Sequence, residues 1–484
     1  MDAPRALVKP SGFREYDARW LYQTEIDLGG VHAVGLALGT LLAERNAGSD
    51  IVTGHDFRAY SEEIHESLNS GLQAAGCVVH DIGLALTPTA YFAQYALDVP
   101  AVAMVTASHN ENGWTGIKMG FNRPFTFGPE DMAALKSLAL SGRGRERKGG
   151  RFKRIDNMKE RYTGDLTNGR KLKRALKVVV ACGNGTAGAF APQVFHALGC
   201  QVVPLHCELD HAFPHYNPNP EDLSMLRDVS GAVLANGTDI GLAFDGDGDR
   251  CGVVDNEGNA IFADKMGVLL ARTISARHPG AKFVVDVKCT GLFHTDPLLR
   301  KNGAQTEYWK TGHSYLKRRT AETGAIAGFE KSGHYFFCEP YGRGYDDGLL
   351  SGIAICEMLA ASQGSLADLY RDLPRTWASP TMSPSCPDST KYQVVEAASR
   401  YLEDLRRSGT RLAGRAIVDC LKVNGVRVML DDGSWVLVRA SSNKPELAVV
   451  CESPVSEAGM RDVFTAIEEL LSSFPEVGNY NQRI

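Results

Sequence analysis

Residues 177–185, Lys-Val-Val-Val-Ala-Cys-Gly-Asn-Gly, decide the fold class of this chain. A β-branched run that ends in a small polar turn is typical of a buried strand that leads into a helix. The same pattern recurs at residues 50–56 (DIVTGHD) and 283–291 (FVVDVKCTG). A second apolar run follows in each segment, at residues 101–105, 240–244 and 325–328. We therefore predict three similar mixed α/β domains, each with one loop directed toward a shared cleft.

The length of the chain, 484 residues, also requires several domains, because single hydrophobic cores stop growing near about 250 to 300 residues. The last part of the chain differs from the rest. It follows the Pro-rich stretch 374–387 and shows a helical pattern at 392–405, then short strands near 417–423, 426–430 and 435–438. This order is typical of an α+β unit. The predicted domains span residues 1–155, 156–262, 263–372 and 373–484.

Composition and charge exclude several classes of protein. With 44% apolar and 23% charged residues and a net charge of −5, neither a general nucleic-acid binder nor a membrane protein is indicated. The uncharged run Leu28–Ala43 is too short to span a bilayer and predicts a buried helix. We interpret the basic run Arg143–Arg154 as a solvated loop or linker. Eleven cysteines without a C-x-x-C pair, and an N-terminus without a signal-peptide core, favour a reducing, cytoplasmic location.

A single hydroxyl marks the loop after the apolar run Val99–Val105. Residues 105–118 read VTASHNENGWTGIK, with Ser108 between Ala107 and His109. A serine is a poor nucleophile unless a base, a metal or an already attached group activates it. The alternative is an ordinary serine in an Asn/Gly-rich surface turn. This stretch alone leaves both interpretations open.

Three carboxylates alternate with glycine in Asp245-Gly-Asp-Gly-Asp-Arg250. Oxygen ligands in this pattern suit a hard cation such as Mg²⁺ or Ca²⁺. An EF-hand requires Gly at the sixth position and Glu at the twelfth, where this chain has Arg250 and Asn256. An acidic turn without an ion would leave three negative charges with only Arg250 to offset them. We therefore predict a Mg²⁺ site that keeps room for water or a phosphoryl oxygen.

Two further loops carry polar side chains suited to a sugar phosphate. In residues 329–335 (FEKSGHY), Glu330 and Ser332 could bind sugar hydroxyls, and Lys288 and His313 lie upstream in the same predicted domain. In residues 439–445 (RASSNKP), Arg439 offers a fork for phosphate, and the Ser and Asn side chains complete an anion cradle. The alternative for the second loop is a polar β-turn with an incidental arginine.

Together these motifs resemble the α-D-phosphohexomutase family, in its phosphomannomutase/phosphoglucomutase branch. The resemblance rests on four motifs in family order, namely TASHN at 106–110, DGDGDR at 245–250, EKSGH at 330–334 and RASSNKP at 439–445. It implies three similar mixed α/β domains and a C-terminal α+β domain of the TATA-box-binding-protein-like kind around a central cleft. It also implies reversible interconversion of hexose 1-phosphate and hexose 6-phosphate, with mannose or glucose as the sugar, through a phosphoserine and a 1,6-bisphosphate intermediate.

The resemblance also implies roles for individual residues. The catalytic group comprises Ser108, His109, Lys118, Arg19, Arg250 and His334. The substrate-binding group comprises Tyr16, Lys288, His313, Glu330, Ser332, Arg439, Ser441, Ser442, Asn443 and Lys444. The metal group comprises Ser108, Asp245, Asp247 and Asp249, for one Mg²⁺ per chain. Glucose 1,6-bisphosphate or an equivalent is the implied activator, sugar phosphates are the implied partners, and a monomer or weak dimer is expected.

Two positions depart from the family pattern. The family's R-A-S-N-T-x-P loop here reads RASSNKP, which leaves the phosphate contacts after Ser441 open. Lys331 stands where relatives that act on both sugars often carry Met and glucosamine-type relatives often carry Gln. Phosphoglucosamine mutase and hexose 1,6-bisphosphate synthase therefore remain alternative activities, as do a metal-dependent phosphatase and a silent sugar-phosphate-binding protein.

Overall fold

The structure is a computed structural model that describes residues 6–442 and 444–482. It contains four β-sheets and divides into two compact units. The first unit runs to Met266 and includes Ser332–Asp368, and the second consists of Gly267–Lys331 and the chain from Leu369 onward. Each unit is described by itself.

The first sheet of the first unit has six strands in the order β1-β5-β4-β2-β3-β6. Its strands are β1 (Ala18–Leu21), β2 (Asp50–His55), β3 (Val78–Leu84), β4 (Ala101–Val105), β5 (Trp114–Phe121) and β6 (Arg151–Arg154). Strands β2, β3, β4 and β6 are parallel, whereas β5 runs antiparallel to both β4 and β1.

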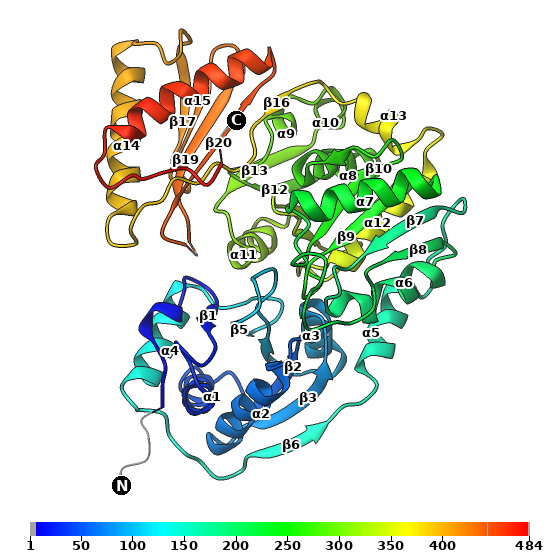
Figure 1. Cartoon of the computed structure of the whole chain (residues 1–484), viewed down its shortest axis with the longest axis vertical. Coiled ribbons are helices and arrows are strands. Elements are labelled where there is room, and N and C mark those ends of the chain that lie inside the picture. Colours follow the sequence, from blue (N-terminus) through cyan, green and yellow to red (C-terminus); the bar gives the residue numbers. More distant parts are fainter. Residues whose placement is uncertain (1–5, 443, 483–484) are drawn as a thin grey trace. The chain divides into compact units, whose positions relative to one another are not determined.

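Helices cover both faces of this sheet. The segments beside it are η1 (Pro10–Gly12), α1 (Leu28–Glu44), α2 (Ser61–Ala74), α3 (Thr87–Ala96) and α4 (Pro129–Leu140). Because side chains alternate along a strand, Ala101, Ala103 and Val105 of β4 join the core under α1, α2 and α4, while α3 contacts β4 and β2 as well. Figure 1 shows α1 and α2 in blue beside the strands of this sheet.

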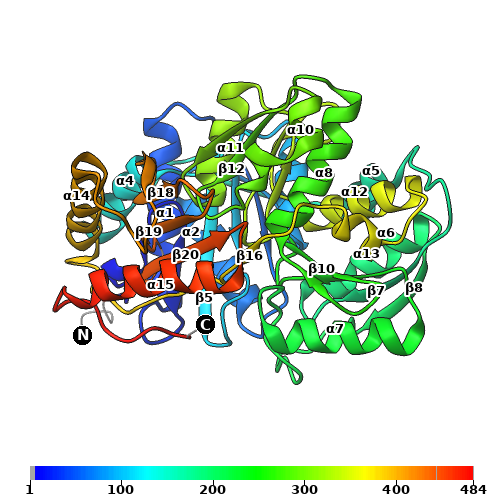
Figure 2. The same cartoon turned by 90° about the horizontal axis from the view of Figure 1, so that it is seen from above.

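The second sheet of the first unit has the order β11-β10-β9-β7-β8. Its strands are β7 (Lys177–Ala181), β8 (Gln201–Leu205), β9 (Ile240–Phe244), β10 (Cys251–Asp255) and β11 (Ala260–Ile261). The helices of this region are α5 (Met158–Thr167), η2 (Thr186–Ala189), α6 (Ala191–Ala197), α7 (Leu223–Asn236) and α12 (Gly348–Ala361). The apolar side of α7 packs on Val179 and Ala243, and Figure 2 shows this green helix alongside the sheet. The short strand β15 (Tyr335–Phe337) also lies in this unit.

The second unit begins with three parallel strands, β13 (Gln305–Trp309), β12 (Lys282–Asp286) and β14 (Ala327–Phe329), which pair in that order. Its helices in this part are α9 (Leu292–Thr295), α10 (Pro297–Lys301) and α11 (His313–Thr323). Two further helices, α8 (Ala263–Arg277) and α13 (Leu366–Arg371), contain the points where the chain passes between the units.

The remaining sheet is antiparallel, with the order β16-β20-β19-β18-β17. Its strands are β16 (Trp377–Ala378), β17 (Ile417–Leu421), β18 (Val426–Leu430), β19 (Trp435–Ala440) and β20 (Leu447–Ser453), and its helices are α14 (Lys391–Ser408) and α15 (Glu457–Ser472). Both helices lie on one face, as Figure 1 shows in orange and red, and share one core with Val436 and Val438. The alternate residues of β19, Trp435, Leu437 and Arg439, therefore lie on the other face.

The predicted fold class, three mixed α/β domains and a C-terminal α+β domain, is confirmed. The buried helix expected at Leu28–Ala43 is α1. One detail was wrong: Arg151–Arg154 in the presumed loop forms β6. The apolar run 325–328 contributes to β14, and the strands expected near 417–423 and 435–438 are Ile417–Leu421 and Trp435–Ala440. The predicted domain boundaries remain a prediction. Among the described residues, every helix is too short or too polar to cross a membrane.

Candidate active site

Ser108 lies at the turn between β4 and β5 in a strained backbone conformation. Its φ of +52° falls in the left-handed region, which costs free energy for a residue other than glycine. The side chain is buried, with 2% of its surface exposed. Its Oγ donates a hydrogen bond to Oδ2 of Asp245 at 3.1 Å and lies 3.2 Å from Nδ1 of His109. The hydroxyl therefore faces the predicted metal ligands and not open solvent.

A buried ion pair at the end of β2 holds this serine loop. Oδ2 of Asp56 accepts hydrogen bonds from Oγ1 of Thr106 and the backbone N–H of Ala107. Arg58, whose Nε lies 3.3 Å from Asp56, donates from Nη2 to the carbonyl oxygens of Ser108 at 3.0 Å and Asn110 at 2.7 Å. Neither residue was predicted, although Asp56 closes the polar turn after the first predicted strand.

The three aspartates after β9 form a compact cluster. Carboxylate oxygens of Asp245, Asp247 and Asp249 lie within 4.8 Å of one another, and all three side chains are fully buried. Among the residues that the structure describes, Oδ1 of Asp247 is buried without a hydrogen-bond partner. A Cβ atom at Gly246 would lie 2.5 Å from the carbonyl oxygen of Ser108, so only glycine allows the two loops to approach this closely. This all-oxygen donor set, with an oxygen still unpaired, fits Mg²⁺.

The charges around the cluster are unequal. Nζ of Lys118, on β5, donates to Oδ2 of Asp247 at 2.7 Å and also contacts Asp249. Burial opposes the charge of Lys118, but the carboxylates outweigh it and raise the pKa of its ammonium group. Burial and the neighbouring carboxylates raise the pKa of Asp245 well above its usual value. For Asp249, Lys118 and His334 overcome the effect of burial and lower the pKa. The cluster would accommodate a further positive charge.

The other predicted catalytic residues of this unit surround the same cluster. Arg250 lies 3.7 Å from Asp245 and 3.3 Å from Glu221. His334 places Nε2 3.2 Å from Asp249 and 3.8 Å from Asp346. Ser332 lies beside it, with Oγ 3.2 Å from Nδ1 of the His334 ring.

Arg19, on β1, pairs with Asp17 at 2.7 Å. Burial opposes the charge of Arg19, but Asp17, Tyr16 and Asp247 raise the pKa of its guanidinium group. Tyr16, which precedes Asp17 in the sequence, is also buried. Arg19 therefore belongs to the electrostatic surroundings of the aspartate cluster, and Tyr16 interacts with Arg19.

Thr87, at the start of α3, is a further contact that no sequence pattern indicated. Its Oγ1 donates to Oδ2 of Asp247 at 2.6 Å, and its backbone N–H donates to the carbonyl of the same residue. Thr87 therefore fixes the aspartate loop by both backbone and side chain. The contact joins residues 160 positions apart, and a threonine before a helix otherwise signals only a helix start.

In the second unit, residues predicted to recognise the sugar follow the ends of strands. Glu330 comes directly after β14, and its Oε1 accepts a hydrogen bond from the backbone N–H of Gly312 at 2.7 Å, next to His313 at the start of α11. Lys288 follows β12, and its Nζ lies 3.8 Å from Oδ2 of Asp286. Lys331 donates from Nζ to the carbonyl of Ser379 at 3.3 Å.

The predicted phosphate clamp is partly preformed. Arg439, at the end of β19, donates from Nε to Asn424 at 2.8 Å and from Nη2 to Oγ of Ser442 at 3.1 Å. Lys391 donates from Nζ to the carbonyl oxygens of Ser441 at 2.5 Å and Lys444 at 3.0 Å. These two hydrogen bonds fix the turn that follows β19. Asn424 and Lys391 were not predicted. Asn443 lies outside the described residues, and Lys444 is exposed.

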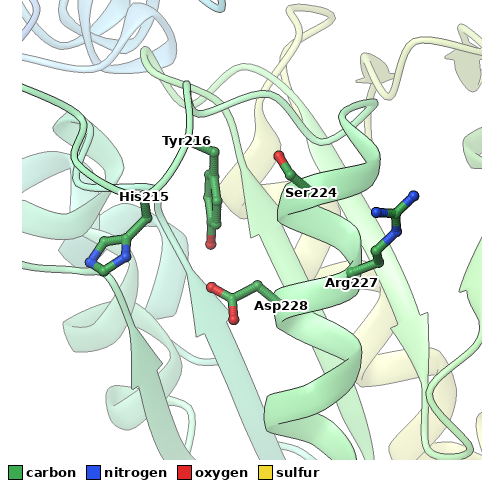
Figure 3. A pocket seen from close by; sticks show the side chains of 5 residues that line it. All are labelled: His215, Tyr216, Ser224, Arg227 and Asp228. Carbon is green, nitrogen blue, oxygen red and sulfur yellow. The ribbon is translucent and has the colours of Figure 1, made fainter.

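A separate shallow pocket of about 450 Å³ lies in the first unit. It is lined by His215, Tyr216, Ser224, Arg227 and Asp228, and Figure 3 shows the Tyr216 hydroxyl pointing toward the Asp228 carboxylate. None of the predicted site residues lines this pocket. The aspartate cluster with Ser108, and not this pocket, is therefore the candidate active site of the first unit.

Comparisons with known proteins agree with this arrangement. Four family models match in order along the chain: phosphoglucomutase/phosphomannomutase alpha/beta/alpha domain I at residues 10–144, domain II at 160–258, domain III at 262–377 and the C-terminal domain at 391–470. The chain is 35% identical to a phosphomannomutase/phosphoglucomutase of Pseudomonas putida, with 98% of each chain covered. It is 32% identical to a phosphoglucomutase of Neisseria gonorrhoeae, over 98% of this chain and 97% of the relative.

A solved structure shows the same similarity. The crystal structure of a phosphoglucomutase/phosphomannomutase family protein from Burkholderia thailandensis superimposes with a TM-score of 0.86 at 30% identity. The superposition covers 98% of this chain and 100% of that chain. The sequence and structure comparisons therefore extend over nearly the whole length.

Proposed function

Because the chain belongs to the phosphoglucomutase/phosphomannomutase family and is an intramolecular phosphotransferase of the phosphohexomutase kind, we propose that it interconverts the 1- and 6-phosphates of mannose and glucose through a phosphorylated Ser108. The observation that carries the proposal is the buried Ser108 hydroxyl 3.1 Å from Asp245. Asp245 is one member of a carboxylate cluster that Lys118 neutralises only in part.

Ser108 acts in this proposal as a phosphoryl carrier. The phosphorus–Oγ bond of phosphorylated Ser108 breaks as a bond forms between phosphorus and the free sugar hydroxyl, whose proton passes to a base. The resulting 1,6-bisphosphate reorients in the site, and its other phosphoryl group then passes to Oγ of Ser108 as the bond between that phosphorus and the sugar oxygen breaks. The base returns its proton to the sugar oxygen that is left. When bound by Asp245, Asp247, Asp249 and phosphorylated Ser108, Mg²⁺ supplies positive charge that stabilises the transferring group.

His334 is the best-suited base among the three candidates for proton transfer, Arg19, Lys118 and His334. Lys118 already donates to two carboxylates, which hold its pKa above the usual value, and Arg19 is paired with Asp17. An imidazole accepts a proton far more readily near neutral pH than either of these groups. We therefore assign proton transfer to His334, and charge neutralisation at the phosphoryl group to Lys118, Arg250 and Arg19. His109, beside Ser108 Oγ, orients the serine side chain.

The remaining predicted residues bind the substrate. Glu330 accepts hydrogen bonds from sugar hydroxyls, with Ser332, His313, Lys288 and Tyr16 as further contacts. The non-reacting phosphate is held by Arg439 with Ser441 and Ser442, together with Asn443 and Lys444. Arg439 is well suited to this role because Asn424 and Ser442 already orient its guanidinium group.

The proposal includes further expectations. Glucose 1,6-bisphosphate or an equivalent recharges Ser108 when the phosphoryl group is lost, and sugar phosphates are the partners, with no role for nucleic acid or membranes. A cytoplasmic location is supported by the eleven free cysteines, which suit a reducing compartment. We expect a monomer or weak dimer.

A rate comparison tests the proposal. Purified protein with Mg²⁺ and a trace of glucose 1,6-bisphosphate should interconvert the 1- and 6-phosphates of mannose and glucose, and glucosamine phosphates serve as the competing substrate class. Ser108→Ala should reduce turnover by at least about 100-fold, because it removes the hydroxyl that carries the phosphoryl group in this proposal. Ser49→Ala, at an exposed serine of the same sheet region, is the matched control. Net phosphate release without isomerisation would contradict the proposal.

A further inference from the structure

The C-terminal sheet buries charged side chains on the face that α14 and α15 do not cover. Val426 and Val428 of β18 join the core under the helices, so Arg427 between them lies on the opposite face. Trp435 of β19 and Glu452 of β20, which are paired in register, lie on that same face. Arg427 and Glu452 are 1% and 2% exposed. Buried charges require specific partners.

Arg427 directs its hydrogen bonds to one short loop. Its guanidinium group lies between the rings of Tyr308 and Trp435, with Cζ 4.1 Å and 3.6 Å from their centroids. Nη1 donates to the carbonyl oxygens of Val287 and Cys289, both at 2.7 Å. Nε and Nη2 are buried without hydrogen-bond partners among the described residues. The directed interactions of Arg427 therefore go to the two residues that flank Lys288.

Glu452 and Tyr308 fix the rest of the same loop. Glu452 accepts hydrogen bonds from Oγ1 of Thr290 at 2.8 Å and from the backbone N–H of Gly291 at 2.8 Å. It also accepts one from Nε1 of Trp435 at 2.7 Å. The Tyr308 hydroxyl donates to the carbonyl of Thr290 at 2.6 Å. Residues 287–291 are thus shaped largely by side chains from the C-terminal sheet and the neighbouring strand β13.

We propose that Arg427 is a positioning residue for Lys288, because it fixes the peptide group that precedes Lys288 and the carbonyl of Cys289, the residue that follows it. This inference rests on the proposed role of Lys288 in binding the sugar phosphate. An apolar side chain stacked between the same two rings would join the two parts of the second unit equally well, so stacking alone does not require an arginine at position 427. The pair of hydrogen bonds to the carbonyls of Val287 and Cys289 determines how the Lys288 side chain leaves the backbone.

Binding of glucose 6-phosphate, measured by calorimetry, provides the direct test. Arg427→Met keeps the stacking volume but removes both hydrogen bonds, so it should weaken binding about 10-fold and raise KM while kcat falls less than about 3-fold. Arg427→Lys keeps one charged donor and should restore part of the affinity. Arg415→Met, which removes an ion pair to Asp432 within the C-terminal domain, is the matched control.

A double-mutant cycle separates positioning from general stability. In a Lys288→Met background, Arg427→Met should cost less than about 2-fold in affinity, because the residue through which it acts is gone. Tyr308→Phe, a mild change that removes the hydrogen bond to Thr290, should weaken binding in the same direction and serves if Arg427→Met does not fold. An undiminished effect of either variant in the Lys288→Met background would overturn the proposal. If the protein did not interconvert sugar phosphates but the effect of Arg427→Met on binding still depended on Lys288, only the proposed function would be overturned.

Discussion

At the scale of single residues, the aspartate cluster is dominated by unbalanced charge. Burial and the neighbouring carboxylates raise the pKa of Asp245, while Lys118 and His334 lower that of Asp249. Each carboxylate therefore has a different electrostatic environment although all three belong to one six-residue motif. A divalent cation would reduce the repulsion among them and stabilise their ionised forms.

Asp247→Asn tests this description of the metal group. The amide keeps the shape and the hydrogen bond from Thr87 but removes one negative charge, so the Mg²⁺ concentration for half-maximal activity should rise on the order of 10-fold or more. Asp228→Asn, in the separate pocket of the same unit, is the control carboxylate and should leave the metal titration unchanged. An unaltered Mg²⁺ requirement in Asp247→Asn would remove Asp247 from the metal site.

Residues that act within one short motif could be predicted from the sequence, whereas supporting residues could not. The alternating pattern of Asp245, Asp247 and Asp249 brings the three side chains together through local geometry alone. Thr87 and Arg58 reach the site through contacts across 160 and 50 residues. A lone threonine or arginine carries no local pattern that identifies such a partner. Tertiary packing, and not spacing, brings these residues to the site.

At the scale of elements, the serine loop depends on the turn after β2. Arg58 donates to carbonyl oxygens of the loop and is itself buried against Asp56. The left-handed φ of Ser108 needs such external support, because the isolated loop would relax to a less strained conformation.

Arg58→Met should therefore impair catalysis, although Arg58 has no proposed contact with the substrate. Loss of the hydrogen bonds to Ser108 and Asn110 should lower kcat about 10- to 100-fold and increase hydrogen exchange in residues 107–113. The control is Arg45→Met, which removes the more exposed ion pairs of Arg45, the C-cap residue of α1, with Glu130 and Asp131. Unchanged exchange in the loop together with normal kcat would show that the ion pair does not hold the serine.

The N-terminus of α12 should make stability depend on pH. Burial raises the pKa of Asp347 to about 7, although Leu350 N–H and the Tyr162 hydroxyl donate hydrogen bonds to it. Since its pKa in the unfolded chain is about 3.9, the folded state holds an extra proton between these values, and the free energy of unfolding falls as pH rises from about 4 to 7. Asp347→Asn removes this proton uptake.

Urea unfolding at pH 5 and pH 8 measures the effect. Asp347→Asn should become more stable relative to the parent protein as pH rises, by on the order of a few kcal/mol. Asp222→Asn, at the N-cap of α7, controls for the loss of a capping carboxylate as such. If the free energy of unfolding changed equally between pH 5 and pH 8 in the parent protein and in Asp347→Asn, the assignment would be contradicted.

Elements with apolar periodicity could be predicted, and those without it could not. The strands at Asp50–His55 and Lys177–Ala181 are β-branched runs bounded by turns, and both form as expected. β6, Arg-Phe-Lys-Arg, is exposed at every residue and is held at the edge of the sheet by parallel backbone pairing with β3 and by an ion pair of Arg154 with Asp81. Its sequence therefore resembles a solvated loop. β20 and α15 were not predicted, although β20 is a buried, largely apolar strand.

At the scale of the whole molecule, the order of the four motifs was the most informative property of the sequence. Each motif falls within its own matched domain, at residues 10–144, 160–258, 262–377 and 391–470. The motif order therefore indicated the family, whereas the division into two compact units was not predicted. In that division the chain enters the second unit at Gly267 and returns to the first at Ser332. The EKSGH motif spans this return, with Glu330 and His334 in different units.

The central claim is that the phosphoryl group passes through Ser108. Protein incubated with glucose 1,6-bisphosphate labelled in its phosphates should acquire label at one site, and peptide mass spectrometry should locate it on the peptide that contains Ser108. Unlabelled glucose 6-phosphate should then remove the label at a rate no slower than turnover. Turnover with an unlabelled Ser108, or a label that the sugar phosphate cannot remove, would contradict the account.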